Sequence, residues 1–544
     1  MFRYFFKQRF HAVLYTVASV SAYITLTIVF YIYSWITDVA LKQNLSEAYN
    51  VTVLSAAVLT ALFLFMTVFS MLKRRVLFNI MKDLRNDVFS KIYNKTIQDY
   101  ASEPTGTYMS VLINDLDTLE SGYFDMCLEL FGDAIQLFIM TAAVFNVGLS
   151  YGIIIILFTL PSIIQPFLLK GALSVIGLKL SNWLGVYTDK VNDFLNSIEV
   201  IKAFNKESYF KQIFGKHTED LTSVKEKFMR IRLVNACLQL VCIYFLKIGV
   251  QLFFMRQAIG GFITVATVSM LFGLSNNIGN PISSILTYIS EINGTKGVRK
   301  KIDNLLNQSV SESTNYFVEP YNNQVSIQNL YLSHGNRQLF RGLNVNFEKG
   351  KKYAIVGESG CGKSTLLKLL MGYSLNYEGS IKINGAEVSE TPPESIWEFI
   401  AYMNQDTFVM QGKLRDNITL MKTYSDDKIL KAAYMSGMKG MIESLPNGLD
   451  SIITEDGKNF SGGEKQRIAI ARAILSGKEI ILIDEGASAL DNKLAEDVEK
   501  TLLSLPDKTV ISVIHRMNDS ILLYDAIYEI TLGIIVRKSE LVYS

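Results

Sequence analysis

Residues 351–370 read KKYAIVGESGCGKSTLLKLL, and this stretch decides the fold of the second half of the chain. An apolar run, KYAIV, leads into a glycine-rich turn that is followed by a helical pattern. Residues 357–364 match G-x-x-x-x-G-K-[ST], in which backbone N–H groups cradle phosphate at a helix N-terminus. We therefore predict a phosphate-binding loop within an α/β domain that has a largely parallel core sheet. The loop residues are Gly357, Glu358, Ser359, Gly360, Cys361, Gly362, Lys363, Ser364 and Thr365.

The chemistry expected of this loop is that of a nucleoside triphosphate with Mg²⁺. Lys363 is placed to reach the β- and γ-phosphates, and Ser364 to ligate the metal. Further on, EIILIDE at 479–485 is an apolar strand that ends in two acids. Asp484 is positioned to hold Mg²⁺, and Glu485 to orient or deprotonate the attacking water.

A second glycine pair opens another helix within FSGGEKQRIAIARAIL, residues 460–475. A single bound nucleotide does not obviously need two phosphate-cradling helix N-termini. We therefore expect Ser461, Gly462 and Gly463 to close over the nucleotide held by another copy. The sequence thus predicts a dimer of ATPase domains.

The first half of the chain is apolar. Of the 544 residues 49% are hydrophobic, with a mean hydropathy of +0.23, and the apolar residues concentrate before residue 300. Six stretches are long enough to cross a bilayer, which takes about 20 apolar residues. Lys and Arg gather at the N-terminus and in the long polar segments between spans two and three and between spans four and five, so both segments and both termini are expected in the cytoplasm. The spans lie near 12–36, 51–72, 127–149, 152–174, 233–256 and 263–289.

The polar segments 73–123 and 176–232 keep a helical period, so we expect helical extensions of the spans. The predicted plan is a transmembrane domain at 1–300, a polar linker at 301–323 and a nucleotide-binding domain at 324–544. The net charge of +2 argues against nucleic-acid binding. The four cysteines form no pattern typical of disulfides or zinc.

With these motifs in order, the chain resembles the ATP-binding cassette (ABC) transporters. FSGGEKQR looks like the signature motif of that family, and the resemblance covers essentially the whole chain. It implies that Gln405 links Mg²⁺ to the membrane domain, that His515 contacts the γ-phosphate, and that Glu455 is the glutamate typical of exporters. It also implies a dimer-interface loop with Ser488 and Asp491. The signature residues that would act on the other copy are Ser461, Gly462, Gly463 and Glu464.

The resemblance also implies a fold class, membrane α plus α/β. A six-helix transmembrane domain with long cytoplasmic helical extensions, type IV ABC exporter-like, precedes a P-loop ABC ATPase domain. The implied cofactors are ATP and Mg²⁺. The implied partners are the lipid bilayer of a bacterial cell membrane and a second copy or a related half-transporter. Where the family stacks adenine on an aromatic residue this chain has His334, with Tyr331 three residues earlier, and Phe460 opens the signature in place of leucine.

Three functions fit these features. The leading one is a half-size ATP-driven exporter of a peptide, an amphipathic compound or a cationic small molecule, working as a homodimer by alternating access. The second keeps the fold but imports a metal chelate of the siderophore type. The third, a soluble cassette ATPase without transport, is opposed by the six spans.

Polar residues within the spans are the clue to the cargo. Asp125, Glu129 and Asp133 are spaced four apart and lie within about 80° on one helix face. Asp133 lies about 24 Å from the outer end of its span and Lys247 about 15 Å, so direct pairing looks poor. We expect a cavity-facing acidic stripe, or else a paired or solvated one, and an acidic partner or an aqueous cavity at Lys247. Asn276 and Asn280 give the sixth span further polar groups, which either line the pathway or bond between helices.

Overall fold

The computed structural model describes residues 1–307, 324–334, 337–373, 377–405, 407–454, 459–484, 492–514 and 519–538. The chain divides into two compact units. One consists of Met1–Tyr93 and Pro104–Gln308, and the other of Asn94–Glu103 and Ser309–Ser544.

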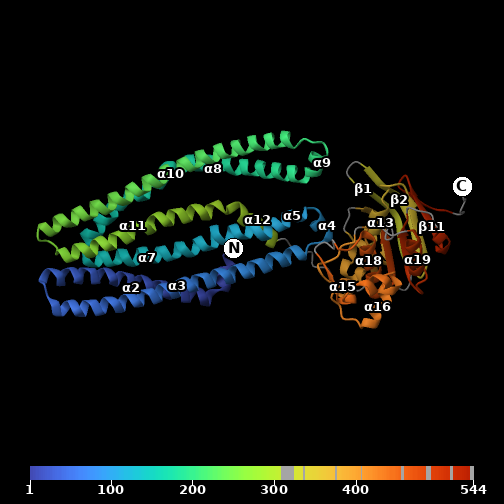
Figure 1. Ribbon diagram of the computed structural model, residues 1–544, viewed down its shortest axis with the longest axis horizontal. Helices are drawn as coiled ribbons and strands as arrows, with labels where there is room; N and C mark the ends of the chain where they lie inside the picture. The colour runs from blue at the N-terminus through green and yellow to red at the C-terminus, as the bar shows by residue number, and fades with distance from the viewer. Residues whose placement is uncertain are drawn as a thin grey trace. The chain divides into compact units, whose positions relative to one another are not determined.

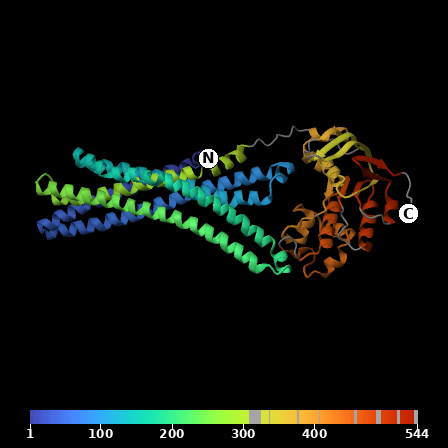
Figure 2. The ribbon, with the colours of Figure 1, turned by 90° about the horizontal axis from the view of Figure 1, so that it is seen from above.

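The first unit is a bundle of long helices (Figure 1). Helices α2 and α3 run side by side, as do α8 and α10, and the two pairs diverge toward α9 in both views (Figures 1 and 2). Two π-helical turns, Val111–Asp115 and Glu120–Phe124, precede α7. The helices between residues 1 and 307 are α1 (Arg3–Lys7), α2 (Arg9–Lys42), α3 (Leu45–Tyr93), α4 (Ile97–Ala101), α5 (Thr105–Ser110), α6 (Leu116–Leu119), α7 (Asp125–Val147), α8 (Leu149–Asn196), α9 (Ile198–Ala203), α10 (Glu207–Ile259), α11 (Val265–Gly294) and α12 (Lys296–Asn307).

Among the described residues, five helical stretches are long and apolar enough to cross a membrane. They are Arg9–Lys42, Leu45–Tyr93, Thr105–Val147, Leu149–Leu169 and Glu207–Ile259. The sixth expected span forms α11, which is not among the five; the polar run LSNNIGNPISSILT at 274–287 lowers its hydropathy. It packs instead against α7, α2 and α10 with Leu271 and Leu274 buried. The extensions expected at 73–123 and 176–232 are largely helical, as predicted.

Two connections differ from the sequence prediction. Spans three and four were expected at 127–149 and 152–174, but α7 ends at Val147 and α8 begins at Leu149, so only Gly148 separates them. Residues 301–307, expected as linker, complete α12 because Val298, Ile302 and Leu306 recur every four residues and give the helix one apolar face. That face packs toward α3, and the amino group of Met1 pairs with Asp303 at 3.3 Å.

Helices α2, α3 and α7 meet through an aromatic contact beside a glycine. The Tyr15 ring stacks on Phe69 with centroids 5.2 Å apart, and its hydroxyl donates to the Leu128 carbonyl oxygen at 2.7 Å. A Cβ atom on Gly132 would lie only 3.1 Å from the Tyr15 hydroxyl. The glycine therefore lets the buried tyrosine reach a backbone acceptor, which a phenol needs away from water.

The second unit is built on two sheets. It also includes residues 94–103, which contain α4. A six-stranded sheet has the order β12-β11-β3-β10-β9-β6, and all neighbours except β11 and β12 are parallel. This confirms the largely parallel core sheet. The four-stranded antiparallel sheet β2-β1-β4-β5 was not anticipated. The strands are β1 (Gln324–His334), β2 (Arg337–Glu348), β3 (Lys352–Gly357), β4 (Tyr377–Ile383), β5 (Ala386–Glu387), β6 (Ile400–Met403), β7 (Gly412–Lys413), β8 (Ile452–Ile453), β9 (Ile480–Asp484), β10 (Thr509–Val513), β11 (Ala526–Thr531) and β12 (Ile534–Arg537).

Strands β3, β9 and β10 are buried almost throughout, as expected for parallel strands covered on both faces. One face carries α13 and the antiparallel strands, and the other carries α18 and α19. The helices of this unit are α13 (Lys363–Leu370), α14 (Pro393–Trp397), α15 (Leu414–Thr419), α16 (Asp426–Met435), α17 (Lys439–Ser444), α18 (Gly462–Ser476) and α19 (Asn492–Leu503).

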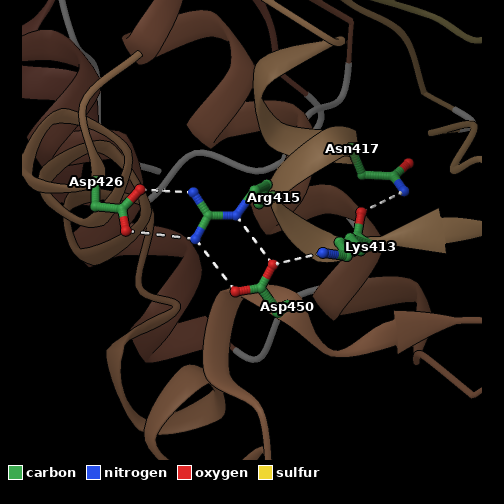
Figure 3. Close-up of polar contacts among 5 residues, drawn as sticks. All are labelled: Lys413, Arg415, Asn417, Asp426 and Asp450. Carbon is green, nitrogen blue, oxygen red and sulfur yellow. Dashed lines mark hydrogen bonds and ion pairs between the residues drawn. The ribbon is translucent and has the colours of Figure 1, made fainter. Parts of the chain in front are cut away.

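Helices α15 to α18 enclose a separate apolar core, and a charged network ties their outer surface together (Figure 3). The Arg415 guanidinium pairs with Asp426 at 2.6 Å and Asp450 at 3.2 Å, and Lys413 also pairs with Asp450 at 3.1 Å. Hydrogen bonding to Arg415 lowers the pKa of both carboxyl groups. Because the pairs are exposed to water and salt, we expect them to add little stability.

Gly379 on β4 offers a test of the antiparallel sheet. Its φ is +105°, and a Cβ atom there would lie 2.2 Å from the Asn329 carbonyl oxygen. We expect Gly379→Ala to destabilise the protein by about 3 kcal/mol, because both backbone strain and a clash result. Differential scanning fluorimetry of the purified chain measures this as a fall in Tm. Gly440→Ala is the control, since Gly440 in α17 has open space around its Cβ position and ordinary φ. A Tm for Gly379→Ala equal to that of the control would contradict the register.

Candidate functional site

The glycine-rich loop lies where the sequence prediction placed it, between β3 and α13. Gly357 ends the strand, residues 358–362 form the loop, and the helix begins at Lys363 and includes Ser364 and Thr365. Three glycines of the loop have positive φ values, a backbone conformation that residues with a Cβ atom rarely adopt. The values are +152° at Gly357, +76° at Gly360 and +103° at Gly362. A Cβ atom on Gly357 would also meet the Ile530 carbonyl oxygen at 2.6 Å. Glycine is therefore required for this loop conformation.

The Lys363 side chain is drawn into the loop. It is only 5% exposed, and its Nζ donates to the carbonyl oxygens of Gly357 at 2.8 Å and Glu358 at 2.9 Å. The ammonium group is thus fixed at a helix N-terminus among backbone groups. Polyphosphate is the ligand that such a loop favours.

Asp484 and Ser364 come together at the carboxyl end of β9. The Asp484 carboxylate is 2% exposed and accepts from the Ser364 hydroxyl at 2.8 Å through Oδ1. Its Oδ2 accepts from the Tyr402 hydroxyl at 3.2 Å. A hydroxyl and a carboxylate beside a phosphate loop are the oxygen ligands that Mg²⁺ prefers. The two side chains that the sequence analysis assigned to Mg²⁺ therefore lie in direct contact.

Tyr402 is a residue that sequence reasoning missed. It lies on β6, whose parallel pairing with β9 brings Met403 opposite Ile483. Burial and the neighbouring Asp484 carboxylate raise the pKa of Tyr402, so the phenol stays a hydrogen-bond donor at neutral pH. The available signal was a tyrosine inside IAYM, an otherwise apolar run two residues before Asn404-Gln405.

Gln405 follows β6 and is exposed, with its backbone N–H donating to the Asn404 side chain at 2.9 Å. The carboxyl ends of β3, β9 and β6 share one edge of the sheet, so Gln405 lies on the edge that holds the loop and Asp484. This is the arrangement that Gln405 needs in order to act on a bound metal.

The expected base-stacking residues lie on β1. Tyr331 is 43% exposed with its hydroxyl over Gly342 of β2, whereas His334 ends the strand opposite Arg337. The guanidinium of Arg337 lies 3.8 Å from the Cβ position of Gly360 in the loop. The backbone of His334 is thus paired with Arg337, whose side chain reaches the phosphate loop. Arg337 is therefore a further candidate for contact with the nucleotide. The side chain of His334 lies outside the described part.

The signature residues open α18. Ser461 is the N-cap, and its hydroxyl accepts from the Glu464 N–H at 3.3 Å. The Glu464 carboxylate accepts in return from the Ser461 N–H at 2.7 Å and hydroxyl at 2.9 Å, which completes a capping box. Gly462 and Gly463 form the first turn. No hydrogen bond between described residues joins this group to the phosphate loop of the same chain.

Several predicted site residues lie outside the residues that the structure describes. They are Glu485, His515, Ser488, Asp491 and Glu455. Their neighbours in sequence are described: Asp484 ends β9 and Val513 ends β10 at the same sheet edge. The described strands β9 and β10 therefore end at the sheet edge that carries the phosphate loop.

The acidic face of α7 has a partner that we did not predict. Lys73 on α3 pairs with Asp125 at 2.8 Å and also with Glu129. These two carboxylates are thus neutralised in part between two helices, and the cavity-facing stripe stays a prediction. None of the ion pairs found among the described residues includes Asp133. One turn along, Gln136 donates to the Asn277 carbonyl oxygen of α11 at 3.2 Å and continues the polar face.

Lys247 has a different environment from the expected one. Its Nζ lies 5.7 Å from the centre of the Tyr244 ring, and no ion pair within the described residues includes it. The Lys247 ammonium is thus near an aromatic ring, and not near a carboxylate of the described residues. Asn276 has a buried Oδ1 without a hydrogen-bond partner in the described part of the chain, and Asn280 is exposed.

Comparison with known proteins covers both units. A family model described as the ABC transporter transmembrane region matches residues 12–282, and one described as ABC transporter matches 340–488. An ATP-dependent lipid A-core flippase of Desulfotalea psychrophila is 25% identical over 83% of this chain and 80% of its own. The multidrug resistance-like ATP-binding protein MdlB of Buchnera aphidicola is 25% identical over 87% and 81%. A bacterial Atm1-family ABC exporter with ATP bound has the same fold, with a TM-score of 0.82 and 21% identity over 97% of this chain and 94% of that one.

Tyr402 generates a prediction about metal dependence. If its hydroxyl orients the Asp484 carboxylate, Tyr402→Phe should raise the Mg²⁺ concentration for half-maximal ATP hydrolysis by about fivefold, the effect of losing one hydrogen bond to a charged group. Ser364→Ala should raise it further. Mn²⁺ binding followed by electron paramagnetic resonance gives a readout apart from turnover. Tyr353→Phe is the control, because its hydroxyl serves the Glu348 backbone and not Asp484. Equal metal dependence in Tyr402→Phe and the control would remove Tyr402 from the site.

Proposed function

Because this chain belongs to the ABC transporter family and joins that family's transmembrane region to its ATPase domain, we propose that two copies assemble into one complete exporter. The membership establishes ATP-driven transport, and the relatives are exporters. The observation that carries the proposal is the contact of Ser364 with Asp484 beside a lysine-bearing phosphate loop. In the described part of the same chain, five helical stretches are long and apolar enough to cross a membrane.

Each described residue of the ATP site has a role in this proposal. Lys363 would bind the β- and γ-phosphates, and Ser364, Gln405 and Asp484 would hold Mg²⁺, which would neutralise phosphate charge. Glu485 and His515 lie outside the described residues; we propose that Glu485 would orient or deprotonate the attacking water and that His515 would contact the γ-phosphate. The buried Asp484 already has a hydroxyl partner on each oxygen, so its orientation is fixed before nucleotide arrives.

The two-chain site is supported by the signature helix. Its N-terminus is capped within its own chain by the Ser461–Glu464 box and makes no hydrogen bond to the phosphate loop of that chain within the described residues. A polar N-terminus of this kind suits a phosphate brought by another molecule. The loop containing Ser488 and Asp491 is proposed to line the same dimer interface. A complete set of site residues in one sequence favours two identical chains.

The proposed cargo is an amphipathic molecule with a cationic group, such as a basic peptide or an organic cation. The argument comes from α7, where one ammonium, Lys73, pairs with two of the three carboxylates on a single helix. Asp133 is the one left without an ion pair among the described residues. Beside it, at Gly132, are the hydroxyls of Tyr15 and Tyr23, at 3.1 and 3.7 Å from the Cβ position. A carboxylate next to aromatic side chains is a suitable environment for a cation with an apolar body.

The proposed location is a bacterial cell membrane, with the ATPase domain and both termini in the cytoplasm. It rests on the basic residues that flank the spans, at Arg3, Lys7 and Arg9 before the first and at 73–75 within α3. No observation favours the siderophore-type importer.

The two-chain ATP site has a direct test. A mixed dimer with Lys363→Ala in one chain and Ser461→Arg in the other keeps one phosphate loop facing one intact signature. Purified through two different tags, it should trap about one nucleotide per dimer with vanadate. The reciprocal control places both substitutions in one chain beside an unchanged partner, and it should trap none because each shared site then lacks one half. The opposite pattern would mean that each chain completes its own site.

The cargo proposal predicts a charge effect at Asp133. A lipophilic cation should stimulate ATP hydrolysis at about fivefold lower concentration than its neutral isostere, the effect of roughly 1 kcal/mol. In Asp133→Asn that difference should disappear. Asp38→Asn serves as control, because Asp38 pairs with Lys42 on α2 away from the α7 face. If Asp133→Asn keeps the preference for the cation, Asp133 does not meet the cargo.

A further inference from the structure

Among the residues that the structure describes, the guanidinium of Arg472, in the third turn of α18, bonds only to uncharged oxygens. Its Nε donates to the Asn417 carbonyl oxygen at 2.6 Å, its Nη1 to the Phe408 carbonyl oxygen at 2.8 Å, and its Nη2 to the Asn417 side-chain Oδ1 at 3.1 Å. Burial lowers the pKa of Arg472 to about 10. Burying the guanidinium without a described carboxylate partner lowers the stability of the fold, because the lost hydration of the charge is not fully replaced. An apolar side chain in the same space would carry no such penalty. A role for Arg472 beyond stability must therefore lie in the three hydrogen bonds that its guanidinium donates to Asn417 and Phe408.

Asn417 of α15 completes the arrangement. It is 1% exposed, and its Oδ1 also accepts from the Met410 N–H at 2.8 Å. Its Nδ2 donates to the carbonyl oxygens of Met410 at 2.8 Å and Lys413 at 3.2 Å. Both donors and both lone-pair positions of the amide are thus occupied, and each partner is backbone or Arg472.

These bonds hold a segment that has no regular structure of its own. Residues 407–411 are neither helix nor strand, and they begin two residues after Gln405. The segment is held at Phe408 by Arg472 and on both sides of Met410 by Asn417. On the other side, Arg472 belongs to the rigid helix that begins with Ser461 and the signature glycines. The planar fork of an arginine fixes the direction of several acceptors at once, which a flexible ammonium does not.

We propose that Asn417 and Arg472 form a clamp that makes the segment after Gln405 and the signature helix move as one body. The two residues are positioning residues and touch no nucleotide. The clamp rests on the proposed two-chain ATP site, in which Gln405 reads the nucleotide on its own phosphate loop and Ser461 serves the nucleotide of the other chain. Through the clamp, ATP and Mg²⁺ on one loop set the position of the signature that this chain offers to its partner, so the two sites of the dimer are coupled.

The structure provides matched variants. Arg472→Lys keeps the charge and removes the fork. Asn417→Asp keeps both acceptor interactions and removes the two donations to Met410 and Lys413, so it is a second route if the first variant fails to fold. Arg415→Lys is the control: it makes the same change on the same helix as Asn417, but Arg415 pairs with Asp426 and Asp450 at the surface (Figure 3).

Hydrogen–deuterium exchange of the full chain in lipid nanodiscs measures the coupling, with peptides covering 405–412 and 459–466. In the unchanged protein and in Arg415→Lys, MgATP should protect both peptides with the same midpoint. In Arg472→Lys and Asn417→Asp, the midpoint for 459–466 should rise to about tenfold above that for 405–412. Equal midpoints in both clamp variants, with Tm close to that of the control, would overturn the clamp.

A second arm separates the clamp from the two-chain site. Without nucleotide, Arg472→Lys should raise exchange in 407–411 about tenfold relative to Arg415→Lys, because hydrogen bonds that hold the segment are lost. If MgATP never protects 459–466 in the unchanged protein, the two-chain site is wrong, and this arm alone then decides whether the segment is held by Asn417 and Arg472. Unchanged exchange there would reject the clamp as well.

Discussion

A carboxylate in hydrocarbon needs a counter-ion, a hydrogen-bond donor or water, and the first unit is organised around this requirement. Lys73 of α3 reaches across to two carboxylates of α7, while the Tyr15 hydroxyl finds the Leu128 carbonyl oxygen next to a glycine. Gln136 then links α7 to the backbone of α11. The polar face of α7 thus contacts both α3 and α11 through side-chain polar groups.

In the second unit the corresponding constraint is the shared carboxyl edge of a parallel sheet. Strands β3, β9 and β6 run parallel and end at the same edge of the sheet. The pairing of the strands alone therefore brings the phosphate loop, Asp484 and Gln405 to one edge. In the helical part, the Asn417 amide joins the backbone of Met410 to the Arg472 guanidinium by hydrogen bonds.

The sequence was sufficient where the signal is local. The phosphate loop lies within one strand–turn–helix unit, and long apolar runs located the helices of the bundle. It was insufficient where the signal depends on the register between elements. Lys73 and Glu129 lie 56 residues apart. Depth along the spans argued against pairing Asp133 with Lys247, but it did not reveal that Lys247 meets Tyr244. Tyr402 was hidden because strand pairing brings it to Asp484. Residues 301–307 looked like linker by composition, yet Ile302 and Leu306 give them an apolar face.

The single residue between α7 and α8 has a mechanical consequence. Gly148, with an extended backbone, is the whole connection, whereas residues 260–264 separate α10 from α11. A connection of one residue cannot lengthen, so any translation of α7 along its axis also moves the start of α8. The angle between the two helices can still change at Gly148. The α10–α11 connection can absorb such a translation. An axial shift that begins at the charged face of α7 is therefore transmitted to the first turn of α8, whatever the angle between the two helices.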